Sequence, residues 1–195
     1  MARIGEIVRT TRETDIRMTL GLDGSGRSEI DTGIGFLDHM LTLFAVHGRM
    51  DLAVSCKGDL SVDCHHTAED IGIVLGQALS AALGGKAGIC RYGTSHVPMD
   101  ETLVRVSLDL SNRPYLAIDL PFTAERIGSL DTEMVPEFFR AVALHGGITL
   151  HIDLLHGTNN HHIAEAAFKA FGRAVREAAT VDASIQGVLS SKGTL

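Results

Sequence analysis

Histidine and glutamate recur with the same spacing in two short segments of the sequence. The first segment, HHTAE, spans 65–69, and the second, HHIAE, spans 161–165. On a helix, residues four apart share a face, so the first histidine and the glutamate of each segment can bind one metal ion together. The second histidine points about a quarter-turn away. We therefore expect each segment to serve two ions or to bridge to another site.

The ligand types narrow the choice of ion. Imidazole and carboxylate together suit Mn, Fe, Co, Ni or Zn. Cys56, Cys64 and Cys90 lack CxxC spacing, which disfavours a structural zinc site and is typical of reduced thiols. A lone buried histidine is usually a hydrogen-bonded core residue, but the paired segments favour metal binding. His39, on a predicted helix, is a seventh candidate ligand.

Basic and hydroxyl side chains offer a second kind of chemistry. Arg91, Arg113 and Lys169, with Ser190, Ser191 and Lys192 near the end of the sequence, suit a phosphate group. Each of them alone is more simply a solvated surface residue. Spacing does not show whether they converge, so a phosphate pocket remains a hypothesis at this point.

The segments that must position these residues also occur twice. Alternating apolar and polar residues at 13–22 and 101–110 predict two half-buried strands in the same register. Each is followed by a predicted helix (36–47 and 133–145), a strand (50–56 and 148–154) and a long helix that contains the histidine pair. Matches in one order predict duplication of a unit of ~90 residues. We expect an α+β fold with two halves, 1–94 and 95–195, in one compact body. Each half should have a mostly antiparallel sheet with two helices on one face, and the helices should pack between the two sheets.

Composition excludes several functional classes. The 195 residues carry a formal net charge of −7, which argues against nucleic acid as the main partner. No apolar run approaches the ~18–20 residues that a membrane span needs. The first residues show no charged region followed by an apolar one, as a signal peptide would. We therefore expect a cytoplasmic protein without a membrane partner.

Four motifs together resemble the imidazoleglycerol-phosphate dehydratase family. They are 33–41 (GIGFLDHML), 63–70 (DCHHTAED), 161–165 with FKAF at 168–171, and SSKG at 190–193. The resemblance runs from about residue 3 to the end of the sequence. It implies a manganese hydro-lyase of histidine biosynthesis with two Mn²⁺ ions per active site and a small phosphate ester as substrate. It also implies a ribosomal protein S5 domain 2-like fold, and a homo-oligomer of 24 subunits built from trimers with active sites between subunits.

The resemblance also implies roles for individual residues. It implies metal ligands at His39, His65, His66, Glu69, His161, His162 and Glu165, and Glu137 is a further candidate ligand. Glu137 is a departure, because many members have a metal-binding histidine there. A carboxylate can replace imidazole on manganese, so this site either keeps a ligand with one more negative charge or loses one. Substrate contacts are expected at Glu13, His39, His47, His65, Arg91, Arg113, His161, Lys169, Ser190, Ser191 and Lys192.

The implied reaction converts D-erythro-imidazoleglycerol phosphate into imidazole acetol phosphate and water. The ring, held as imidazolate between two metal ions, would help to expel the hydroxyl group, and carboxylates would carry protons. Glu13, Glu69 and Glu165 are the candidate catalytic carboxylates. Glu13 has a plainer reading, because its repeat counterpart Glu101 can be a surface residue at a strand end. Two rivals use the same ligands: a metal-dependent hydrolase and a non-catalytic, metal-storing shell protein.

Overall fold

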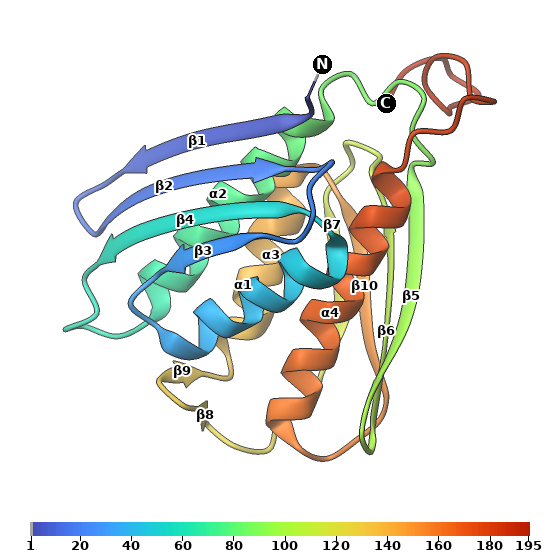
Figure 1. Cartoon of the computed structure of the whole chain (residues 1–195). Coiled ribbons are helices and arrows are strands. Elements are labelled where there is room, and N and C mark those ends of the chain that lie inside the picture. The colour runs from blue at the N-terminus through green and yellow to red at the C-terminus, as the bar shows by residue number, and fades with distance from the viewer. Residues whose placement is uncertain (1) are drawn as a thin grey trace.

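Eight strands form two four-stranded sheets in the computed structural model, which describes residues 2–195 (Figure 1). Each sheet has three antiparallel strands and ends in a strand that pairs in parallel. The first sheet, in spatial order, contains β1 (Ile4–Thr10), β2 (Thr14–Gly21), β4 (Asp51–Gly58) and β3 (Ser28–Asp31). The second contains β5 (Tyr92–Met99), β6 (Thr102–Asp109), β10 (Thr149–His156) and β7 (Tyr115–Asp119). A small hairpin joins β8 (Arg126–Ile127) to β9 (Leu130–Asp131).

Four helices fill the space between the two sheets (Figure 1). They are α1 (Gly35–Gly48), α2 (His65–Leu83), α3 (Met134–Gly146) and α4 (Asn160–Ala179). Helix α1 packs on α4 and helix α2 packs on α3, while α2 also covers β1 and β2, and α4 covers β5 and β6. The α+β class and the placement of the helices between two sheets are confirmed.

The core lies where the helices meet the inner faces of the sheets. The alternating residues Ile16, Met18, Leu20 and Leu22 are buried in the first half, as are Val104, Val106, Leu108 and Leu110 in the second. The aromatic rings of Phe44, Phe138, Phe139, Phe168 and Phe171 pack against one another between the helices. This apolar packing makes the beginnings of the helices rigid supports for polar side chains.

Glycines at equivalent places allow each helix pair to approach closely. A Cβ atom on Gly172 of α4 would lie 2.5 Å from the Phe44 carbonyl oxygen of α1, and one on Gly76 of α2 would lie 2.7 Å from the Val142 oxygen of α3. Only glycine fits such backbone contacts. The close approach of α1 and α4 brings the first turns of both helices together.

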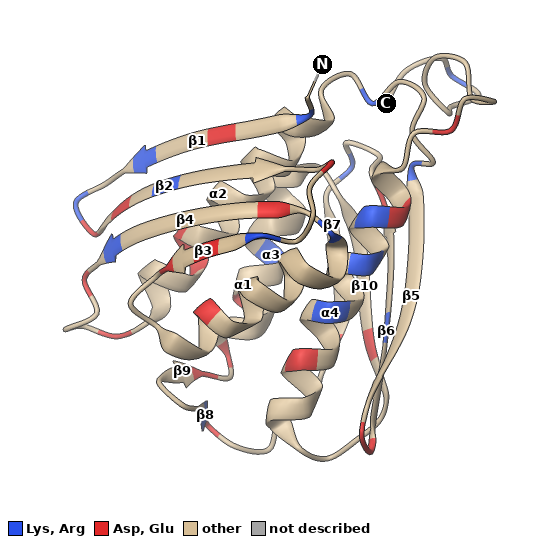
Figure 2. Ribbon diagram, viewed as in Figure 1, with Lys and Arg blue, Asp and Glu red and all other residues tan. Residues whose placement is uncertain are grey.

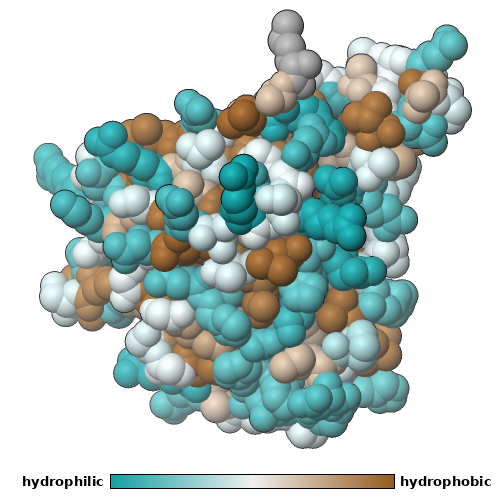
Figure 3. Space-filling model, viewed as in Figure 1, coloured by the Kyte–Doolittle hydropathy of each residue, from teal (hydrophilic) through white to brown (hydrophobic). Residues whose placement is uncertain are grey.

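The surface is mixed in character. Figure 3 shows hydrophobic residues in separate patches among hydrophilic ones, and Figure 2 shows acidic and basic bands along α4. Among residues 2–195, every helix is too short or too polar to cross a membrane.

Candidate functional site

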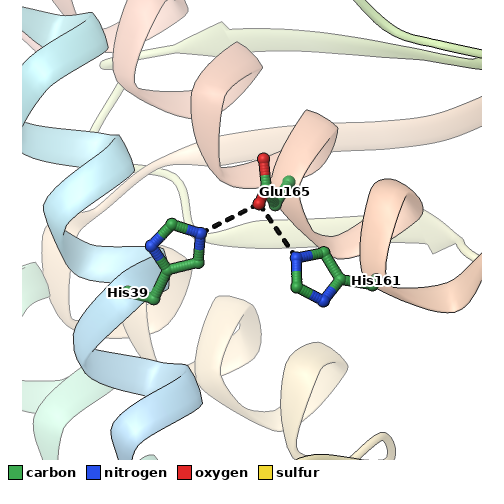
Figure 4. A group of neighbouring side chains, drawn as sticks. All are labelled: His39, His161 and Glu165. Carbon is green, nitrogen blue, oxygen red and sulfur yellow. Dashed lines mark hydrogen bonds and ion pairs between the residues drawn. The ribbon is translucent and has the colours of Figure 1, made fainter.

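Three side chains from two helices meet where α1 and α4 begin (Figure 4). The Nε2 atoms of His39 and His161 each lie 2.9 Å from Oε1 of Glu165. The three ligand atoms all lie within 4.8 Å of one another, and this is the one such group of three or more potential ligands found among residues 2–195. His39 comes from the first half of the chain, and the other two residues from the second. We call these residues the triad.

Local structure fixes the part of the triad that lies on α4. Asn159 is the N-cap of this helix, and its side-chain oxygen accepts hydrogen bonds from the backbone N–H groups of His161 and His162. His161 and Glu165 then lie one turn apart on the same face. Phe36 of α1 packs edge-on against the His161 ring, with 5.2 Å between ring centroids. The His161 ring therefore has a defined orientation towards Glu165.

Glu165 is an ionised carboxylate in a largely buried place, with 8% of its side chain exposed. Burial by itself would raise its pKa. Hydrogen bonds from Lys169, His39 and His161 outweigh burial and lower the pKa to about 2. The Lys169 ammonium lies 2.6 Å from Oε2, so Oε1 is left to face both imidazoles.

The triad fits a divalent transition-metal ion in donor type and spacing. Two ligand atoms that each lie ~2.1 Å from one ion, at a right angle, are ~3 Å apart. The two 2.9 Å contacts to Oε1 match that spacing. Two imidazole nitrogens and a carboxylate oxygen suit Mn, Fe, Co, Ni or Zn.

The first histidine segment does not complete a second triad among the residues that the structure describes. Nε2 of His65 lies 3.8 Å from Oε2 of Glu69, and both side chains are about half exposed. Glu137, the expected substitute ligand, pairs with Arg140 at 3.3 Å. Its role as a ligand stays a prediction.

The second histidine of each segment points away from the first, as predicted. Nδ1 of His66 lies 2.9 Å from Asp59 in the loop after β4, and its Nε2 lies 3.8 Å from Glu13. Nδ1 of His162 lies 2.7 Å from Glu101, in the turn between β5 and β6. These carboxylates raise the pKa of both histidines, and the bond from His162 lowers the pKa of Glu101 to about 2.

The residues predicted to hold phosphate fall into two groups. Arg91 is buried; it forms a two-fold contact with Asp109, at 2.7 and 3.0 Å, and donates to the Leu189 carbonyl at 2.6 Å. Nη2 of Arg113 lies 3.4 Å from Asp109. The backbone N–H of Arg91 bonds to Ala178, near the end of α4. Ser190 and Ser191 line a cavity with Arg91 there.

Lys169 and His47 belong to a different region. Lys169 contacts Glu165, and the pKa of His47, at the end of α1, is lowered by burial and by the nearby Lys169 and Arg173. Glu165 and Ala178 are separated by ~20 Å along α4, at 1.5 Å per residue. We call the cavity lined by Arg91, Ser190 and Ser191 the Arg91 region. Within one chain, the triad and the Arg91 region therefore lie far apart.

Comparison with known proteins decides the family. Residues 32–175 match the sequence model of the family described as imidazoleglycerol-phosphate dehydratase. The chain belongs to this family. An imidazoleglycerol-phosphate dehydratase from Acetivibrio thermocellus is 59% identical over 195 residues, which cover 100% of both chains.

Solved imidazoleglycerol-phosphate dehydratases share the fold. The crystal structure of the Staphylococcus aureus enzyme has a TM-score of 0.83 at 46% identity, over 92% of this chain and 99% of that one. The structure of the Pyrococcus furiosus enzyme in complex with (S)-C348 has a TM-score of 0.84 at 40% identity, over 97% and 100% of the two chains. The predicted family, hydro-lyase class and dehydration of imidazoleglycerol phosphate in histidine biosynthesis are confirmed.

Sequence reasoning missed two carboxylates that contact candidate ligands in this member of the family. Asp59 carries no motif, and only its place in the loop before the first histidine segment hinted at a role. Glu101 had a signal, as the repeat counterpart of Glu13, but was weighed only as a surface residue. Its oxygens in fact bind His162 and the N–H of Asn159.

Proposed function

We propose that the chain dehydrates D-erythro-imidazoleglycerol phosphate to imidazole acetol phosphate in a manganese site built on the triad. The observation that carries this proposal is the convergence of His39, His161 and Glu165 on a common point between two helices. We place the activity in the cytoplasm, where amino-acid biosynthesis takes place.

We further propose that the site is completed by another copy of the chain, in a 24-subunit assembly built from trimers. The His39 and His161 side chains are 46% and 47% exposed, so a single copy leaves the triad open to solvent. Enclosing the substrate would expel water and strengthen the electrostatic interactions in the site. The Arg91 region lies ~20 Å along α4 from Glu165, too far for a small phosphate ester to contact both in one copy.

In this proposal, the first histidine segment supplies ligands for a second metal ion. His65, His66, Glu69 and Glu137, with His162, are the ligands left outside the triad. Two Mn²⁺ ions, when bound, supply Lewis-acid stabilisation of negative charge on the substrate ring.

The protein side chains then divide the remaining work. Lys169 keeps Glu165 ionised and directs one of its oxygens towards the imidazoles. Glu13 is 52% exposed and lies 3.8 Å from Nε2 of His66, its one ion-pair partner among the described residues. Its exposed carboxylate suits proton transfer beside the bound substrate ring. Arg113 and the Ser190–Lys192 segment contact the phosphate and supply binding energy away from the reacting carbons.

Elemental analysis combined with a turnover assay tests the function. Purified protein should contain manganese, lose turnover of imidazoleglycerol phosphate on chelation, and regain it with Mn²⁺. The product should be a ketone that keeps its phosphate ester. Release of inorganic phosphate would instead identify a hydrolase, and bound metal without turnover would identify a storage protein.

A matched pair of variants tests the place of the site. His39→Ala should lower both metal content and turnover. His96→Ala, on the exposed face of β5, should change neither. Full metal content and turnover in the His39 variant would remove the triad from the site.

A further inference from the structure

In each segment, a carboxylate contacts Nδ1 of the second histidine and leaves Nε2 on the other edge of the ring. Asp59 Oδ2 lies 2.9 Å from Nδ1 of His66, and Glu101 Oε2 lies 2.7 Å from Nδ1 of His162. An ionised carboxylate only accepts hydrogen bonds, so each contact places the ring proton on Nδ1. The lone pair of each neutral ring is then on Nε2.

We propose that Asp59 and Glu101 are positioning residues that set the tautomer and the ring orientation of His66 and His162 for metal binding. This inference rests on the proposed function. A metal-binding histidine commonly donates its other ring N–H to a carboxylate, which orients the ring and makes the ligating nitrogen more basic. Neither carboxylate belongs to the ligand set that the histidine segments predict.

The two halves supply these carboxylates from different elements. In the second half, Glu101 comes from the hairpin turn between β5 and β6, next to the start of α4. Its counterpart in the first half is Glu13, in the turn between β1 and β2. There, however, the contact to Nδ1 comes from Asp59, in the loop between β4 and α2. That loop covers 59–64, whereas the equivalent loop before α4 covers only 157–159.

This exchange gives the two hairpin glutamates different tasks. Glu101 accepts hydrogen bonds from His162, from the N–H of Asn159 at 3.0 Å and from Thr102 Oγ1 at 3.0 Å. Its oxygens are engaged in fixing the beginning of α4 and one ring. In the first half, Asp59 makes the contact to Nδ1 of His66. Glu13 instead lies 3.8 Å from Nε2 of His66, on the side where an ion would bind.

Asp100 has the corresponding place in the second half. It lies 3.8 Å from Nε2 of His162 and is largely exposed. Each second histidine therefore has one carboxylate bonded to Nδ1 and another beside Nε2. The arrangement recurs although the residues come from non-equivalent positions.

A metal titration tests the assignment with a readout that does not depend on turnover. Mn²⁺ is added to the metal-free protein, and free Mn²⁺ is measured by electron paramagnetic resonance. Glu101→Gln and Asp59→Asn should each raise the Mn²⁺ dissociation constant of one class of site by ~10–100-fold. Glutamine keeps an oxygen for the Asn159 N–H, so the start of α4 is retained. Glu29→Gln, on an exposed position of β3, is the matched control and should leave binding unchanged.

A double-mutant cycle distinguishes positioning of the ring from general support of the fold. If Glu101 acts through His162, adding Glu101→Gln to His162→Gln should weaken Mn²⁺ binding less than twofold further. The same should hold for Asp59→Asn in His66→Gln. Full, additive losses, or single variants that bind like the Glu29 control, would overturn the inference while leaving the metal site intact. A wild-type protein that binds no Mn²⁺ would overturn both the inference and the proposed function.

Discussion

Glu13 lies beside a candidate metal ligand, with its carboxylate about half exposed and 3.8 Å from Nε2 of His66. We expect Glu13→Gln to lower kcat by ~10²–10⁴, because the amide keeps the shape but cannot carry the proton. Metal content should be unchanged, which elemental analysis of the same sample measures. Turnover close to that of the wild type would exclude Glu13 from proton transfer.

Glu165 makes acid stability depend on the triad. Its pKa in the folded chain is about 2, against an ordinary value of 4.5. A lowered pKa stabilises the folded state above the ordinary value, and this contribution is lost as the pH falls from 4.5 towards 2. We expect the free energy of unfolding of the metal-free protein to fall less steeply over that range in Glu165→Gln than in the wild type, as measured by urea titration at each pH. Equal slopes would contradict this prediction.

Residue types in the sequence predicted the three members of the triad as candidate ligands, but not their contacts. Repetition identified His161 and Glu165, and the structure joins them to His39 from a distant part of the sequence. Arg91 shows what spacing could not reveal. Its guanidinium is bound to Asp109 and to the Leu189 carbonyl, and its contact with phosphate stays a prediction. Such partners come from the tertiary fold and leave no periodic signal in the sequence.

At the scale of elements, the segment from Val188 onwards is tied to the loop between α2 and β5, by a backbone bridge between Ala87 and Val188 and by the bond from Arg91 to the Leu189 carbonyl. This contact holds Ser190 and Ser191 beside Arg91. We expect a chain that ends before Ser190 to have a sharply raised KM for imidazoleglycerol phosphate, because phosphate binding energy is lost. Steady-state kinetics measure this effect, and a KM equal to that of the full chain would reject the segment as a phosphate contact.

The elements that sequence reasoning predicted have one largely buried face, although β5 has one too and was not predicted. Central strands such as β2 and β6 alternate strictly between buried and less buried residues, and the helices carry continuous apolar stripes. Edge strands such as β1 and β7 are only partly buried, so their alternation is weak and they were not predicted. The two-residue strands β8 and β9 are too short for any period to show.

At the scale of the whole molecule, the single chain presents ligands on an open surface. If each ion binds ligands from different copies of the chain, the free energy of metal binding also stabilises the assembly. We expect chelation to reduce the molecular mass of the assembly together with activity, as measured by light scattering after size-exclusion chromatography. An assembly that keeps its full mass without metal would contradict metal sharing between copies.

The open triad and the separate first segment also have a genetic consequence. A chain with His161→Ala still offers an intact first segment, and a chain with His65→Ala still offers an intact triad. Co-expression of these two inactive chains should produce some mixed sites without a defect, and hence measurable turnover and growth of a histidine auxotroph. Sites built within one chain would show no such complementation. Two defective alleles therefore distinguish a site shared between two chains from a site within one chain.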